Sequence, residues 1–196
     1  MLDAAVKGSD DENCQLCRTR KYNDCAVKMF EARKYLCMGN YVEGDKAARS
    51  VIGRAVVTWV PESEISTNDP LKKNYVFSEE LLFCLYESNL RDLYTASFTS
   101  TSGLYMTEET YEALYEMSTY GAYTDYRYTY QTEALTDIRV CTKLKQPASG
   151  NSLYHFRLPL LRLSEAYYIP AECALPQNGD VESPTRSLTT VLYQRS

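Results

Sequence analysis

Residues 22–41 read YNDCAVKMFEARKYLCMGNY. The apolar side chains of this stretch recur at spacings of three and four, the period of one helix face, which predicts a helix over 22–38. Gly39 and Asn40 follow, and both residue types favour the left-handed backbone that ends a helix. A second amphipathic helix is predicted over 42–52, so the chain begins with a helical pair.

Two antiparallel helices joined by a tight turn make one tetratricopeptide-like unit, a repeat of about 34 residues. A second helical pair is predicted over 159–194. Its first helix is expected over about 159–175, with a kink at Pro170 because proline removes a backbone donor. The next helix is expected to begin near Ser183 and Pro184. Each pair has an apolar stripe that it cannot bury alone, so the two pairs should pack together.

Residues 54–158 lie between the pairs and indicate a loop-rich region with short strands. The run 55–60 predicts a strand, and the apolar run 81–86 fits either a buried strand or a short helix. Residues 95–103, rich in Thr, Ser and Gly, are expected to be irregular. A short helix is predicted over 107–117. Its inner side is expected to comprise Tyr111, Leu114, Tyr115 and Met117.

Tyrosine is unusually frequent, with 18 residues against one Trp and five Phe. Several tyrosines cluster between Tyr120 and Tyr130. The last of them, Tyr126, Tyr128 and Tyr130, alternate with other residues, and this spacing predicts a strand.

Two segments carry a resemblance to a known family. Residues 22–41 resemble the SusD/RagB helix Ala-Arg-x-Tyr-Leu-x-Met-Gly-Asp/Asn-Tyr, and the residues through Ile52 resemble its partner helix. LRLSEAYYIPAE, residues 161–172, resembles the family's C-terminal Arg-x-x-Glu-x-Tyr-Leu-x-x-Ala-Glu helix, in the same order along the chain. The chain departs from the pattern at Pro170, where the family usually has a helix former, and in its last ten residues, 187–196.

The expected fold is mainly α, with tetratricopeptide-like helical pairs and a loop-rich middle carrying short strands, as in an incomplete SusD-like domain. Residues 1–21 are expected to be a polar lead segment, and 22–196 a partial SusD-like domain. No export signal is recognisable at the start, and the resemblance implies a truncated or degenerate member. Apolar helix faces without a covering repeat favour self-association of the isolated chain.

The resemblance implies a function without catalysis. A SusD-like protein would be lipid-anchored on the outer face of the outer membrane, where it would bind oligosaccharides and pass them to a TonB-dependent transporter. The alternative is a tetratricopeptide-like scaffold that binds another protein through its concave helical face. A glycosidase is a weaker alternative, because no local pattern marks a pair of opposed carboxylates.

Sugar capture needs aromatic faces and hydrogen-bonding side chains. The candidate ligand-binding residues are therefore Trp59, Tyr120, Tyr123, Tyr126, Arg127 and Tyr128. The same rings could instead pack the loop-rich region against the repeats, with each tyrosine hydroxyl finding a partner, and this second interpretation is the more common outcome for tyrosine.

Charge and composition exclude several other functions. The net charge is −5, with 21 basic and 26 acidic residues interspersed, so no basic stripe predicts nucleic-acid binding or electrostatic docking on a membrane. No glycine-rich phosphate loop occurs, and no cofactor is expected. His155 is the only histidine, which argues against a triad hydrolase.

The seven cysteines are odd in number and irregularly spaced, which argues against a disulfide framework. Cys14 and Cys17 have a metal-like spacing, but two further zinc ligands are missing, so no metal is expected. Four cysteines in apolar or helical patterns are expected to be small buried hydrophobes: Cys25, Cys37, Cys84 and Cys173.

Overall fold

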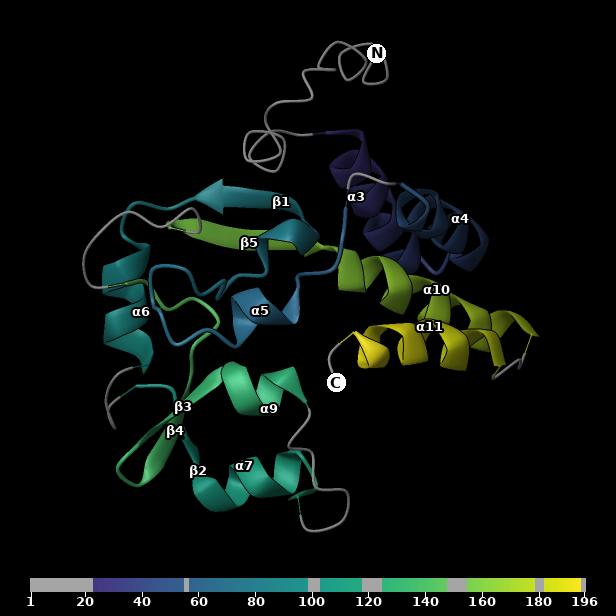
Figure 1. The fold of residues 1–196 in the computed structure, drawn as a ribbon. Helices are drawn as coiled ribbons and strands as arrows, with labels where there is room; N and C mark the ends of the chain where they lie inside the picture. The colour runs from purple at the N-terminus through teal and green to yellow at the C-terminus, as the bar shows by residue number, and fades with distance from the viewer. Residues whose placement is uncertain are drawn as a thin grey trace. The chain divides into compact units, whose positions relative to one another are not determined.

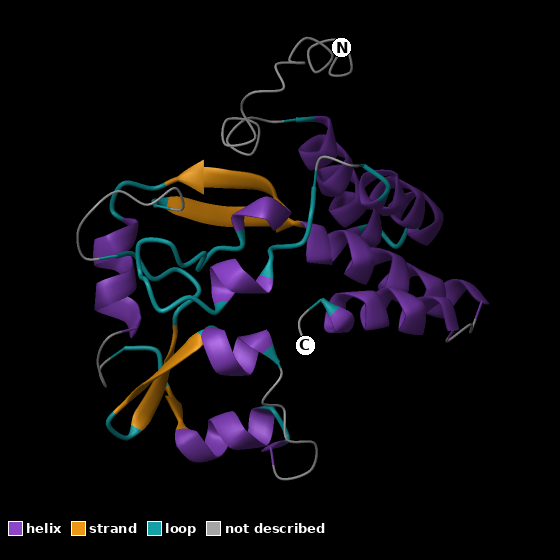
Figure 2. Ribbon diagram, viewed as in Figure 1, coloured by secondary structure: helices purple, strands orange, loops and turns teal. Residues whose placement is uncertain are grey.

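The computed structural model describes residues 23–54, 57–98, 103–117, 125–147, 155–178 and 182–194. The chain divides into two compact units. The first unit consists of residues 1–59, 79–85 and 159–194, and the second of 60–78, 86–158 and 195–196. Figures 1 and 2 show the helices and strands of both.

The first helical pair forms where the sequence predicts it. Helix α3 spans Asp24–Cys37 and helix α4 spans Tyr41–Ile52. The side chain of Asn23 accepts a hydrogen bond from the backbone N–H of Ala26 and so caps α3, and Asn40 caps α4 in the same way. Gly39 lies between them at a φ of 71°, a left-handed backbone that glycine adopts without steric cost.

The second helical pair is confirmed, but its beginning differs from the prediction. Helix α10 spans Leu163–Asn178 and helix α11 spans Glu182–Tyr193. The expected helical start at residue 159 is wrong, because strand β5 occupies Arg157–Arg162 and pairs with strand β1, Leu81–Tyr86. The pairing also decides between the two interpretations of residues 81–86 in favour of a strand.

The two helical pairs share one hydrophobic core, as the sequence predicts. Helix α10 packs against α3, α4 and α11 (Figure 1). Fully buried core residues come from both pairs and from β1, and include Ala26, Met29, Ala32, Ala48, Val51, Leu82, Ala166 and Cys173. A Cβ atom on Gly44 of α4 would lie 3.2 Å from the Sγ of Cys173, so the absence of a side chain lets α4 and α10 approach closely.

One ion pair connects the two segments that resemble the SusD/RagB motifs. The guanidinium of Arg33 on α3 donates two hydrogen bonds of 2.6 Å to the carboxylate of Glu165 on α10. It also donates to the backbone carbonyl of Leu160, at 3.1 Å. The hydrogen bond from Arg33 to Glu165 raises the pKa of the guanidinium. A bidentate ion pair therefore joins two residues that lie 132 positions apart in the sequence.

The second unit combines short helices with one small sheet. Strand β4, Ile138–Cys141, lies between β2, Met106–Thr107, and β3, Thr132–Leu135, and both pairings are antiparallel. The short helical elements described between residues 60 and 131 are α5 (Glu62–Ile65), η1 (Ser78–Glu80), α6 (Leu90–Phe98), α7 (Glu108–Leu114) and α9 (Tyr126–Tyr130).

Three local predictions for the middle region are wrong. Residues 57–60 form no strand in the described part of the chain, because no partner strand lies beside them to complete a ladder. Residues 95–98 belong to helix α6 rather than to an irregular segment. Residues 126–130 form helix α9 instead of a strand. The fold class is nevertheless confirmed, since the chain is mainly helical with small sheets.

Candidate functional site

The tyrosines of α9 lie on two sides of a short helix. Asp125 begins the helix, because its carboxylate accepts the backbone N–H of Arg127 at 2.8 Å. Helical spacing brings Tyr126 and Tyr130 together, with ring centroids 5.7 Å apart. Tyr128 contacts a different set of rings. A strand would have placed all three tyrosines on one face.

Tyr128 belongs to a cluster of three aromatic rings. It stacks on Tyr111 of α7, with centroids 4.6 Å apart and an interplanar angle of 19°. Tyr115 meets both rings edge-on, at 5.1 Å from Tyr111 and 5.5 Å from Tyr128. Offset stacking and edge-to-face contacts are the arrangements that aromatic quadrupoles favour. We call these three residues the tyrosine cluster.

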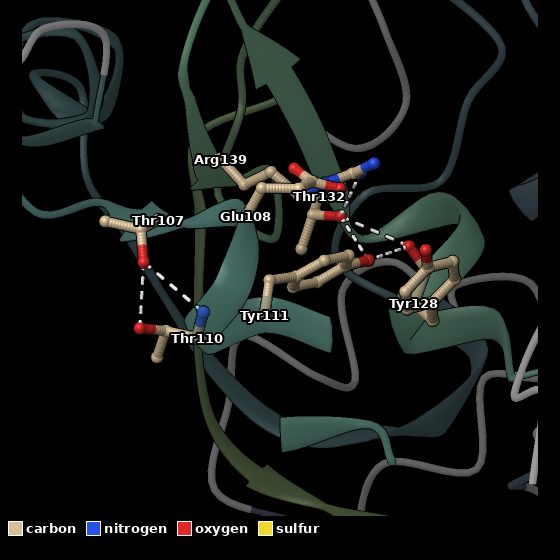
Figure 3. Close-up of polar contacts among 7 residues, drawn as sticks. All are labelled: Thr107, Glu108, Thr110, Tyr111, Tyr128, Thr132 and Arg139. Atoms are coloured by element: carbon tan, nitrogen blue, oxygen red, sulfur yellow. Dashed lines mark hydrogen bonds and ion pairs between the residues drawn. The ribbon is translucent and has the colours of Figure 1, made fainter. Parts of the chain in front are cut away.

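Hydrogen bonds of the Tyr111 hydroxyl fix the ring at the centre of the tyrosine cluster (Figure 3). The hydroxyl of Tyr111 donates to the backbone carbonyl of Tyr128 and lies 2.7 Å from the hydroxyl of Thr132 on β3. Tyr111 is fully buried, and burial raises the pKa of its phenol to about 12. Tyr111 is therefore a structural centre, whereas Tyr115 and Tyr128 are only half-buried.

Two arginines flank the tyrosine cluster, and each is paired with a carboxylate. The guanidinium carbon of Arg139 lies 4.4 Å from the centroid of the Tyr111 ring and 5.7 Å from that of Tyr128. Glu108 accepts hydrogen bonds of 2.7 and 3.0 Å from Arg139 and raises its pKa. Figure 3 shows Arg139 and Glu108 meeting above the Tyr111 ring.

Arg127 is the second arginine. Its guanidinium carbon lies 6.0 Å from the centroid of Tyr115, and its side chain donates to Asp125 at 2.5 Å. Burial alone would raise the pKa of Asp125, but hydrogen bonds from the side chain and backbone of Arg127 and its positive charge outweigh burial and lower it. Arg127 itself is exposed, so the cluster carries a charged hydrogen-bonding group at the surface.

The other side of α9 faces a small hydrophobic core. Tyr126 and Tyr130 pack against a cluster of buried residues, namely Val60, Ile65 and Phe77. The Nζ atom of Lys73 lies 5.5 Å from the centroid of Tyr75 and 5.8 Å from that of Tyr130. This side therefore combines a packed interior with a cation close to two aromatic rings.

The remaining predicted ligand residues lie elsewhere. Trp59 belongs to the first unit, where its ring lies 5.5 Å from that of Tyr167 on α10. Tyr120 and Tyr123 lie outside the described residues. Of the six candidates, the structure brings Tyr126, Arg127 and Tyr128 together on α9.

Sequence patterns missed the role of Arg139, and they placed Tyr111 on an inner helix side without identifying its ring partners. The pairing of β2 with β4 sets Met106 opposite Arg139, which brings the arginine beside the helix that follows β2. That juxtaposition depends on a strand pairing between distant segments, for which no local signal exists.

The described residues contain no group of three or more His, Cys, Asp or Glu side chains placed to hold a metal ion. His155 is buried, and burial together with the nearby Arg91 lowers its pKa. Cys84 and Cys173 are buried as predicted, but Cys37 is exposed, because it is the last residue of α3. Within the part of the chain described, no helix is long and apolar enough to cross a membrane.

Comparison with known proteins supplies a fold relationship. No protein-family model and no curated protein matches the chain. A SusD superfamily protein from Bacteroides thetaiotaomicron VPI-5482 is similar in structure, with a TM-score of 0.66 and 21% identity, over 91% of this chain and 42% of the other. A SusD superfamily protein from Bacteroides fragilis matches with a TM-score of 0.62 and 17% identity, over 92% of this chain and 39% of the other.

A SusD-like carbohydrate-binding protein from Bacteroides vulgatus ATCC 8482 also matches, with a TM-score of 0.63 and 14% identity, over 90% of this chain and 38% of the other. The expected SusD-like fold is therefore confirmed. The chain spans about two fifths of the length of these structures.

Proposed function

We propose that this chain contributes to the non-catalytic binding of oligosaccharides. The SusD-like fold supports the proposal, since one solved structure that shares it is a carbohydrate-binding protein. The observation that carries it furthest within this chain is the tyrosine cluster, where half-buried rings lie beside an exposed arginine. Aromatic faces with adjacent hydrogen-bonding groups suit pyranose rings, which are apolar on their faces and polar at their edges.

Within this proposal, Tyr128 and Arg127 contact the sugar directly, and Tyr126 contributes from the other side of α9. Tyr128 is already held by stacking on Tyr111, so little side-chain entropy is lost when a ligand binds. Arg127 is oriented by Asp125, and its guanidinium is a donor of the kind that sugar hydroxyls accept. Tyr120 and Tyr123 remain further candidate contacts, and Trp59, in the first unit, remains a separate candidate for sugar contact.

The wider role follows the family resemblance. The full protein would capture oligosaccharides as a lipid-anchored protein on the outer face of the outer membrane and pass them to a TonB-dependent transporter. The likeness of the described fold to SusD superfamily structures supports this role. Co-purification of the full-length protein with such a transporter would test it.

Isothermal titration calorimetry of the 196-residue chain with oligosaccharides selected on a glycan array tests the binding proposal. Arg127→Ala, which alters an exposed side chain, should weaken binding at least tenfold without changing the melting temperature by more than a few degrees. Tyr128→Ala should weaken binding as well, with a moderate loss of stability because its ring is stacked. Tyr193→Ala is the control, since Tyr193 is 76% exposed on α11 of the other unit.

Two outcomes would contradict the proposal. If the wild-type chain is folded but retains no oligosaccharide from the array, it does not bind sugars. Unchanged affinity in both Arg127→Ala and Tyr128→Ala would show that sugar binds away from the tyrosine cluster.

A helical scaffold for a protein partner is the second candidate function. It is favoured by exposed apolar side chains on α11, where Leu188 is 41% exposed and Leu192 is 55% exposed. These two residues are four positions apart and share one helix face. Retention of a protein partner together with failure to bind any glycan would favour this alternative.

A further inference from the structure

Lys73 occupies an unusual place in the second unit. Its ammonium lies near the rings of both Tyr75 and Tyr130, at 5.5 and 5.8 Å from their centroids. The ring of Tyr130 is in turn 5.7 Å from that of Tyr126. All three tyrosines are half-buried, so the ammonium lies within a partly exposed aromatic surface rather than in a closed core. We call Lys73, Tyr75 and Tyr130 the lysine site.

The charge of Lys73 is less well compensated than that of the arginines near other tyrosine rings of this unit. Arg139 pairs with Glu108 and Arg127 pairs with Asp125. The Lys73 ammonium makes neither an ion pair nor a hydrogen bond with any carboxylate in the described part of the chain.

Glu133, the carboxylate whose charge acts on Lys73, is already engaged, because it pairs with Lys145. Burial is the main cause that lowers the pKa of Lys73, the charge of Lys145 lowers it further, and Glu133 opposes both. An ammonium that is partly desolvated and lacks an anionic partner is stabilised by an incoming anion.

We propose that the lysine site recognises an anionic sugar residue, with its carboxylate or sulfate on the Lys73 ammonium and its ring beside Tyr75 and Tyr130. This inference rests on the proposed function and names the ligand class as acidic oligosaccharides. The rings supply apolar contact for the sugar face, and the ammonium supplies up to three hydrogen-bond donors to the acid group.

The overall charge of the chain does not oppose this assignment. The net charge is −5, which would repel an acidic ligand at long range. At physiological ionic strength, however, exposed charges farther than about 8 Å are largely screened. Discrimination between acidic and neutral sugars therefore depends on the charges close to the ligand, which at this site are Lys73 and the mutually paired Lys145 and Glu133.

The test compares the affinity of the 196-residue chain for three oligosaccharides of equal length: an oligogalacturonate, a neutral oligogalactoside and a sulfated oligogalactoside. Wild-type chain should bind one of the acidic ligands about tenfold more tightly than the neutral one, as one close charge pair allows. Lys73→Gln should remove that preference, and Lys73→Arg should retain most of it. Preference for the sulfated ligand over the uronate would identify the acid group as sulfate.

Lys72→Gln is the matched control. Lys72 is the adjacent lysine, its side chain is 80% exposed, and it pairs with Asp69. The Lys72→Gln variant should leave both the affinity for oligosaccharides and the preference for acidic ones unchanged. Circular dichroism melts of the three variants show whether each is folded, and Lys73→Arg keeps the test valid if Lys73→Gln is unstable.

The outcomes separate this inference from the proposed function. If wild-type chain binds the neutral and acidic sugars equally, or if folded Lys73→Gln keeps the preference for acid, the inference is overturned while the proposed function stands. If wild-type chain binds no oligosaccharide of any kind, both are overturned.

Discussion

Asp125 has two roles at the start of α9: its carboxylate caps the helix and pairs with the guanidinium of Arg127. The pKa of Asp125 is lowered from its ordinary value of 3.8, so the ionised carboxylate stabilises the folded state. This contribution is present at pH values above about 4 and is lost as the pH falls through the lower folded-state pKa.

Asp125→Asn should therefore be less stable than wild type at pH 7, and the difference should shrink as the pH falls below about 4. The cost at pH 7 should stay below about 1 kcal/mol, because Arg127 is exposed and asparagine can still cap the helix. Urea unfolding at a series of pH values measures the difference. Asp137→Asn, in the exposed turn between β3 and β4, serves as the control. A difference between wild type and Asp125→Asn that does not change with pH would show that the charge of Asp125 is irrelevant.

Single residues also show where sequence patterns failed. Tyr126, Tyr128 and Tyr130 alternate, but five residues are too few to separate a strand from one helical turn. The capping carboxylate of Asp125 favours the helix. Leu114 was predicted to face inward and is 63% exposed, because α7 ends at this residue and buries only Tyr111 against the sheet.

Among the elements, α3 and α10 are joined by the pair of Arg33 and Glu165. Glu165→Gln should destabilise the chain by about 1 kcal/mol. The pair is bidentate, which strengthens it, but both side chains are partly exposed to water, which weakens it. Asp45→Asn provides the comparison, because Asp45 pairs with Arg49 within α4 and should cost less than about 0.5 kcal/mol. Chemical unfolding at neutral pH measures both. Equal losses in the two variants would show that Arg33 and Glu165 do not couple the helices.

The helical pairs were predictable because each carries its own signal of apolar spacing and capping residues. The start of α10 could not be predicted in this way, since residues 157–162 form a strand only by pairing with 81–86, some 75 positions earlier. The partner of Glu165 was equally hidden from the sequence, because Arg33, far away in the chain, donates both hydrogen bonds.

At the scale of the whole molecule, the first unit exposes apolar side chains on several helices. On α11, Leu188 is 41% exposed and Leu192 is 55% exposed, and on α3, Phe30 is 57% exposed. Contiguous apolar surface drives association in water. The isolated chain should therefore sediment as concentration-dependent oligomers, and Leu188→Lys combined with Leu192→Lys should shift it toward the monomer. A wild-type chain that stays monomeric at all concentrations would contradict this prediction.

If the proposed function is right, this SusD-like chain binds oligosaccharides and leaves them intact. Saturation-transfer proton NMR of the 196-residue chain with an oligosaccharide retained on the glycan array reports binding and turnover in one experiment. Magnetisation should pass from the protein to the sugar protons, and the anomeric signals of the oligosaccharide should remain unchanged over a day. The absence of transfer from a folded chain, or the growth of new reducing-end signals, would contradict the account.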